Sequence, residues 1–139
     1  MKRIAVQGIA GSFHEDAANQ YFNEEIEVVE CKSFTTVCQL IDADKVDIAV
    51  MAIENSIAGS LLKNYQLIRD YHLRIIGEIY LHIQMNLLVV PGVDPKNIED
   101  IYSHPIALQQ CMEYIEKYYP NAELHEALDT AGSAKYISE

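Results

Sequence analysis

The chain has 139 residues, 50% of them hydrophobic and 22% charged, a composition typical of an ordered globular protein. A chain of this length can bury roughly two-thirds of its unfolded surface. Its formal net charge of -11 argues against a nucleic-acid or anionic-membrane partner, because both require a basic face. Any anionic ligand must therefore be held by local hydrogen-bond donors against the overall field of the protein.

The cysteines and the first residues bear on the cellular compartment. Cys31, Cys38 and Cys111 have neither metal-ligand nor redox-pair spacing, which predicts free thiols in a reducing environment. The chain starts with an apparent strand rather than a signal peptide, and no apolar run approaches the length of a membrane span. These features predict a cytoplasmic protein.

The first half of the chain alternates strand and helix patterns, which predicts βαβ units and a parallel sheet. Ser33 is expected to cap the second helix. The expected strands are 2–7, 25–31 and 46–53, and the expected helices are about 14–22, 34–43 and 60–70.

The third expected strand leads into a candidate site. Residues 46–53 do not alternate apolar with polar, which is typical of a strand buried on both faces. Glu54, Asn55 and Ser56 follow directly, where open α/β sheets usually bind ligands. A carboxylate, an amide and a hydroxyl at this position predict a small-molecule site.

A glycine-rich turn, Gly8–Gly11, joins the first strand to the first helix. Its Gly-x-x-Gly spacing matches neither a dinucleotide site nor a P-loop. Two interpretations stay open for it, a tight turn only or a turn whose amides contact an anion. His14 and Glu15 are expected on the surface of the following helical turn, with Glu15 suited to the positive helix end.

Residues 72–90 carry a different pattern. Apolar and polar residues alternate from Ile79 to Leu87, as in a half-exposed strand. We expect one long strand here that runs from one lobe into another, with the boundary near Glu78, so that the lobes are 1–77 and 78–139. His82 is interpreted as a polar residue of this strand rather than a metal ligand, because no second ligand lies at a useful spacing.

The second half predicts two more strand–helix pairs. Strands are expected at 98–102 and 121–128, each followed by polar residues at a helix start, Ser103-His104 and Asp129-Thr130. The first of these helices has an apolar side made by Ala107, Leu108, Cys111, Met112, Ile115 and Tyr118. With the polar group after residue 53, these helix starts predict a two-lobed site for a small polyanionic acid, bound through neutral dipoles and helix ends. The pattern shows no metal cluster, cofactor fingerprint or nucleophile–base pair.

Four motifs in this order resemble the prephenate dehydratase family over nearly the whole chain. They are Gly8-Ile9-Ala10-Gly11-Ser12-Phe13 with Ala17-Ala18, Ile53-Glu54-Asn55-Ser56 with Gly59-Ser60, Ser103-His104-Pro105 with Gln110-Cys111, and Thr130-Ala131 with Ala134.

The resemblance implies a lyase of phenylalanine biosynthesis that converts prephenate to phenylpyruvate with loss of CO2 and water. It implies an α/β fold of the type 2 periplasmic-binding-protein kind, with two lobes, the second incomplete here. Neither a metal nor an organic cofactor is expected, and the expected partner is the small-molecule substrate. The substrate-binding residues carried over by motif or by their place at a helix start are Glu54, Asn55, Ser56, Ser103, Gln110 and Thr130. Glu54 would repel a dianion, so we interpret it as an orienting residue.

The chain also departs from the family pattern. The family's Thr-Arg-Phe motif, whose threonine is regarded as the key catalytic group, is absent and would come after Glu139, as would the phenylalanine-binding ACT domain. Ala52, His14 and Ile106 replace residues that are common in the family. We therefore expect no catalytic residue and little activity in these 139 residues. We also expect self-association into a homo-oligomer through an exposed sheet edge. The alternative function is a non-catalytic module of the same fold that binds a small carboxylate or amino acid.

Overall fold

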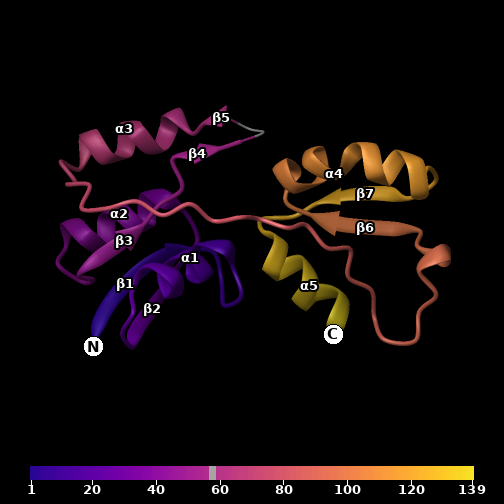
Figure 1. The fold of residues 1–139 in the computed structure, drawn as a ribbon, viewed down its shortest axis with the longest axis horizontal. Helices are drawn as coiled ribbons and strands as arrows, with labels where there is room; N and C mark the ends of the chain where they lie inside the picture. Colours follow the sequence, from indigo (N-terminus) through magenta and orange to yellow (C-terminus); the bar gives the residue numbers. More distant parts are fainter. Residues whose placement is uncertain (57–58) are drawn as a thin grey trace. The chain divides into compact units, whose positions relative to one another are not determined.

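The computed structural model describes residues 1–56 and 59–139, which form two compact units, Met1–Ile83 and Gln84–Glu139 (Figure 1). The expected division into lobes 1–77 and 78–139 of one catalytic domain stays a prediction. Among the described residues, no helix combines the length and the apolar character needed to cross a bilayer. The three cysteines are free thiols. Burial raises the pKa of each thiol, so they are poor nucleophiles at neutral pH.

The first unit is built on a parallel sheet of three strands in the order β2-β1-β3. This parallel βαβ arrangement confirms the prediction from sequence. The elements of this unit are β1 (Lys2–Gln7), α1 (Phe13–Tyr21), β2 (Ile26–Cys31), α2 (Phe34–Asp42), β3 (Ile48–Val50), β4 (Glu54–Asn55), β5 (Gly59–Ser60) and α3 (Leu62–Asp70).

Helices cover both faces of this sheet because alternate residues of β1 point to opposite sides. Ala5 packs with Val37 of α2 on one face. Ile4 and Val6 pack with Ala18 of α1 on the other. All three β1 residues are 0% exposed, so the central strand carries the core of the unit.

Both sheet-covering helices begin at a serine that satisfies a free amide of the first turn. The Ser12 hydroxyl accepts a hydrogen bond from the Glu15 N–H at 3.3 Å, and the Ser33 hydroxyl accepts one from the Thr36 N–H at 3.1 Å. The predicted cap at Ser33 is confirmed.

The second unit is smaller and has a parallel pair of strands, β6 and β7. Helix α4 covers one face, where Ile101 packs with Leu108 and Ile115. Helix α5 approaches the other face, where the Tyr102 and Tyr136 rings lie 5.3 Å apart. The elements are a 3-10 turn η1 (Pro95–Asn97), β6 (Asp100–Ser103), α4 (Pro105–Tyr118), β7 (Glu123–Glu126) and α5 (Thr130–Ser138).

Several predicted elements are corrected. Residues 72–90 form no strand, although their alternation is that of one, because no described residue provides a neighbouring strand with which to pair. The strand expected at 46–53 forms only over Ile48–Val50. Tyr118, expected in the core, is 55% exposed because α4 ends there and the next residue, Tyr119, packs against the core instead.

Candidate functional site

The polar residues after β3 lie in a small hairpin rather than at the end of the buried strand. β3 ends at Val50, and Glu54 and Asn55 form β4, which pairs antiparallel with Gly59 and Ser60 of β5. Gly59 has φ +75°, a conformation that favours glycine. The helix expected to open at Gly59-Ser60 begins instead at Leu62.

The Glu54 carboxylate is held by two hydroxyl groups. Its Oε1 accepts hydrogen bonds from the Ser60 hydroxyl at 2.7 Å and the Tyr65 hydroxyl at 3.1 Å. Burial, followed by the bond to Glu54, raises the pKa of Tyr65, so the phenol stays a donor. A carboxylate bound in this way has the contacts that an orienting residue needs, and that role stays a prediction.

Asn64 anchors the same region from α3. Its side chain is 3% exposed, and its Nδ2 donates to the Ala52 carbonyl at 2.7 Å. This bond connects α3 to the chain just before the hairpin. Asn64 was not identified from the sequence, where a polar residue inside an amphipathic helix gives no sign of being buried.

In the second unit, the predicted helix-start residues share one edge of the sheet. Ser103 is the last residue of β6 and lies opposite Glu126, the last residue of β7. The Ala127 N–H then donates to the Ser103 carbonyl at 2.9 Å. The first residue of α5, Thr130, follows three positions later. The chain therefore brings the starts of α4 and α5 to the same edge, as the parallel strand pattern predicts.

In each of these two helices, the side chain of the cap residue accepts a hydrogen bond from one free N–H group of the first turn. His104 accepts the Ile106 N–H through Nδ1 at 3.2 Å, and Asp129 accepts the Gly132 N–H at 2.5 Å. The sequence left His or Ser open as the first cap and Asp or Thr as the second, and the structure selects His104 and Asp129. Ser103 and Thr130 are thus not the caps, and the substrate-binding role of their hydroxyl groups stays a prediction.

A small pocket of about 240 Å³ lies between the second sheet and α5. Asp129 is part of its wall, whereas Ser103 and Thr130 are not. Gln110, the remaining predicted residue, is half-buried in the middle of α4. The pocket is lined by Tyr102, Ala127, Leu128, Asp129, Gly132, Ser133 and Tyr136. The predicted site residues therefore fall into two groups, Glu54, Asn55 and Ser56 in the first unit, and Ser103, Gln110 and Thr130 in the second.

Backbone N–H groups of the glycine-rich turn donate hydrogen bonds to carboxylates of the protein itself. The Ala10 N–H donates to Glu30 at 2.6 Å, and the Gly11 N–H donates to Glu15 at 2.5 Å. Gly8 has φ +115°, and a Cβ there would lie 2.9 Å from that of Ser12. Of the two interpretations left open, these contacts favour the tight turn over an anion site.

His14, expected on the surface, is instead turned inward. Its ring packs edge-on against Phe34 with centroids 5.2 Å apart, and its Nε2 is buried without a hydrogen-bond partner. This burial lowers the pKa of His14, opposed by a hydrogen bond with the backbone of Gln7. The prediction failed because a first-turn residue of α1 can still face α2.

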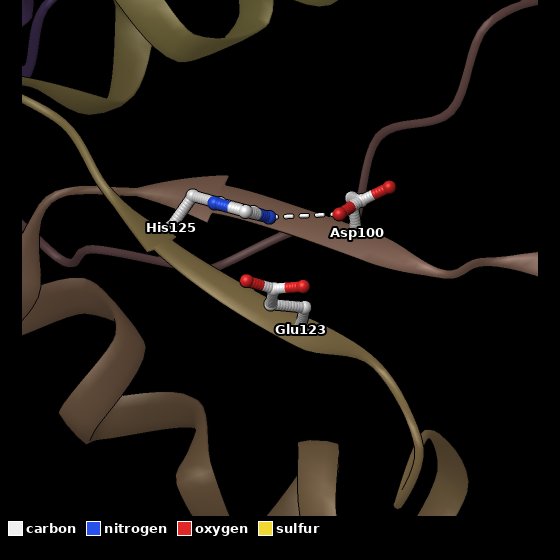
Figure 2. Close-up of side chains that lie close together, drawn as sticks. All are labelled: Asp100, Glu123 and His125. Atoms are coloured by element: carbon white, nitrogen blue, oxygen red, sulfur yellow. Dashed lines mark hydrogen bonds and ion pairs between the residues drawn. The ribbon is translucent and has the colours of Figure 1, made fainter.

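Sequence reasoning missed a cluster on the face of the second sheet that points away from α4. Asp100, Glu123 and His125 bring their ligand atoms within 4.8 Å of one another (Figure 2). His125 Nε2 lies 2.7 Å from Asp100 Oδ1. The available signal was the pair of patterns Asp-x-Tyr and Glu-x-His, but only the strand register shows that they coincide.

Together these elements define an α/β protein of the periplasmic-binding-protein type. The predicted fold class is confirmed. The sequence profile of the family described as prephenate dehydratase matches residues 4–139, and the chain belongs to this family.

The chain is similar to plant dehydratases over almost its whole length. It is 39% identical to Arogenate dehydratase 2 of Petunia hybrida over 137 residues, which are 98% of this chain and 34% of that protein. It is 38% identical to Arogenate dehydratase/prephenate dehydratase 2, chloroplastic, of Arabidopsis thaliana, covering 98% of this chain and 35% of the relative. The chain therefore spans about a third of the length of these relatives.

Two solved structures share its fold. One, described as GqqA, a novel type of quorum quenching acylase, has a TM-score of 0.80 and 26% identity, covering 98% of this chain and 49% of that one. The other is a prephenate dehydratase from Arthrobacter aurescens in complex with L-Phe, with a TM-score of 0.72 and 24% identity, covering 97% and 45%.

Proposed function

We propose that these residues form the substrate-binding part of a prephenate dehydratase, a lyase of phenylalanine biosynthesis that converts prephenate to phenylpyruvate with loss of CO2 and water. The observation that carries this proposal is the family match, which covers residues 4–139. The relatives named for dehydration of prephenate or arogenate match over the same length.

The reaction makes limited demands on the protein, because loss of the carboxylate and the hydroxyl yields an aromatic ring. The enzyme has to hold a dianion, align its leaving groups and supply a proton to the departing hydroxyl. Neutral donors suit the first two tasks in a chain with a net charge of -11. The proposed donors are Asn55, Ser56, Ser103, Gln110 and Thr130.

Glu54 has a different role in this proposal. Its carboxylate would repel a dianion, but it already accepts bonds from Ser60 and Tyr65. These bonds pull it toward β5 and α3 and keep the hairpin closed, so that Asn55 and Ser56 are held in one conformation. Glu54 is then a positioning residue that acts through its neighbours.

The 139 residues lack the Thr-Arg-Phe motif, so their own turnover is expected to be low. Binding without catalysis would also fit the alternative, a module that holds a small carboxylate or amino acid. Arogenate is a second candidate substrate, because relatives 39% and 37% identical are named for it. We further propose a cytoplasmic homo-oligomer, supported by the free thiols and by exposed apolar residues in 75–90.

Calorimetric titration of the chain with prephenate, arogenate, phenylpyruvate and phenylalanine tests the proposal. We expect prephenate or arogenate to bind more tightly than the other two. Asn55→Ala, Gln110→Ala and Ser103→Ala should each weaken that binding by about tenfold, as expected for loss of a hydrogen bond to a charged group. Ser138→Ala, at the exposed end of α5, is the matched control.

The outcomes separate the alternatives. Binding of phenylalanine alone favours the non-catalytic module, and an unchanged affinity in all three variants contradicts the assigned residues. An absorbance assay that follows phenylpyruvate formation checks the expected low activity of the 139 residues. Robust turnover by the 139-residue chain would contradict the expected low activity.

A further inference from the structure

The face of the second sheet that points away from α4 carries four aligned side chains. In the parallel register, Asp100 lies directly opposite Glu123, and Tyr102 lies directly opposite His125. Ile101, the residue between Asp100 and Tyr102, packs with α4 on the other face. Because successive residues of a strand point to opposite sides, these four side chains share the face away from α4. Figure 2 shows the Asp100, Glu123 and His125 side chains converging on this face.

This placement leaves negative charge uncompensated. Like charges directly opposite one another destabilise a strand pair. In the part of the chain that the structure describes, neither Asp100 nor Glu123 forms an ion pair with a lysine or arginine, and the contact present is between Asp100 and His125. A cation on this face would remove the repulsion that the strand register imposes.

The imidazole of His125 is held in an orientation that suits a ligand. Its ring stacks on Tyr102 with centroids 4.4 Å apart and planes 14° apart, and Tyr102 in turn contacts Tyr136 of α5. The stacking keeps Nε2 directed toward Asp100, at 2.7 Å. When the proton of the neutral ring is on Nδ1, the lone pair of Nε2 is available to a metal ion.

We propose that Asp100, Glu123 and His125 bind a divalent transition-metal cation of the zinc type. Ligand atoms about 2.1 Å from a tetrahedral ion lie about 3.4 Å apart, and the three ligand atoms here lie within 4.8 Å of one another, so no pair has to close by more than about 1.4 Å. Rotation of the exposed carboxylate side chains can provide this movement. The donor set of one imidazole and two carboxylates favours Zn²⁺ over Ca²⁺ or Mg²⁺, which prefer six or more oxygen ligands. Water completes the coordination.

The bound ion would link β6 to β7. These strands have four residues each and pack a hydrophobic core against a helix on one face only, so their pairing gains from a link across the other face. An ion that binds the folded unit and not the unfolded chain stabilises the fold in proportion to its occupancy. This inference is independent of the proposed dehydratase function and concerns the stability of the second unit.

The test uses the untagged chain, freed of metal with a chelator and titrated with Zn²⁺ by calorimetry. We expect one site, whose association constant falls by at least about tenfold in His125→Asn. Loss of a residue that only hydrogen-bonds to a metal ligand already lowers metal affinity by about that factor. His72→Asn is the matched control, since it removes an exposed imidazole at a position with φ +52° that asparagine tolerates. Equal affinities in the two variants, or no binding by the unchanged chain, would overturn the proposal.

A second pair of variants separates a metal site from a purely structural cluster. Glu123→Gln removes the repulsion with Asp100, so it should preserve or raise the Tm of the metal-free chain while abolishing the rise in Tm that Zn²⁺ causes. Glu116→Gln, an exposed position on α4, should leave that rise unchanged. A Zn²⁺-induced rise that persists in Glu123→Gln would show that the ion binds elsewhere. Co²⁺ in place of Zn²⁺ should give a d–d absorption spectrum without the charge-transfer band of a thiolate ligand.

Discussion

The two units bury their sheets to different degrees. In the first, β1 has a parallel neighbour on each side and a helix on each face, and its central residues Ile4, Ala5 and Val6 are 0% exposed. In the second, β6 has one neighbour and a packed helix core on one face, and Ile101 is 8% exposed. A strand therefore reaches full burial here only where pairing and helix packing come from both directions. The face left without a core in the second unit is the one that carries the polar side chains of Asp100, Glu123 and His125.

Truncation of matched core residues gives the largest expected effect. Ile4→Ala should lower the stability of the first unit by about 4 kcal/mol, and Ile101→Ala should lower that of the second by about 2 kcal/mol, because the larger cavity forms where packing surrounds the side chain. Hydrogen exchange of the amides in β1 and β6 measures the two losses separately. Equal losses would show that the second sheet is packed as fully as the first.

Substitution of Asn64 tests whether the stable packing of the first unit also holds the hairpin that carries Glu54 and Asn55. Asn64→Ala removes the bond to the Ala52 carbonyl and leaves that buried acceptor unsatisfied, so we expect a loss of about 1–3 kcal/mol. Exchange of the amides of Glu54, Asn55, Gly59 and Ser60 should accelerate more than exchange in β1. Asn19→Ala, on the exposed side of α1, is the control. If the hairpin amides keep their protection, Asn64 does not hold this region.

The same contrast explains what could be predicted from the sequence. The strands and caps of the first unit follow from local patterns, such as the apolar run at β1 and the serine before α2. The failures at residues 72–90 and at His14 both depend on contacts between distant segments. Alternation predicts a strand, but a strand requires a partner, and no pattern within 72–90 shows whether one exists.

The candidate site was predictable to a similar extent. Helix starts at Ser103-His104 and Asp129-Thr130 follow from cap residues, and their common edge follows from the parallel strands. The contacts of Glu54 with the Ser60 and Tyr65 hydroxyl groups and the Asp100–Glu123–His125 cluster were not predictable, because they depend on strand register and on helix placement that no local pattern encodes.

The helix caps allow the two units to be compared through one kind of contact, a side-chain oxygen that accepts a first-turn N–H. Ser33→Ala and Asp129→Ala should each cost about 1 kcal/mol, with Asp129 the larger because its charge also favours the positive end of α5. Urea unfolding followed by circular dichroism measures both. Asp129→Asn, which keeps the acceptor and removes the charge, should recover most of the loss. A full loss in Asp129→Asn would assign the effect to charge rather than to capping.

The smallest expected effect is the pH dependence contributed by His14. Burial lowers the pKa of its folded-state imidazole below the ordinary value of 6.5. As the pH falls through 6.5, the unfolded chain therefore binds the proton first, and stability decreases toward acid. At pH 8 both states are neutral, and the residue contributes no slope.

His14→Phe should remove this slope, because an aromatic ring keeps the contact with Phe34 and cannot be protonated. The measurement is the Tm of both proteins from pH 8 to pH 5, with the gap in favour of the variant widening below about pH 6.5. His72→Asn, which removes an exposed imidazole from the same unit, should follow the unchanged chain. Parallel curves for His14→Phe and the unchanged chain would mean that the ring is solvated enough to be protonated at the same pH in both states. In that case solvent would reach the packing around α1 more easily than the packing around β1.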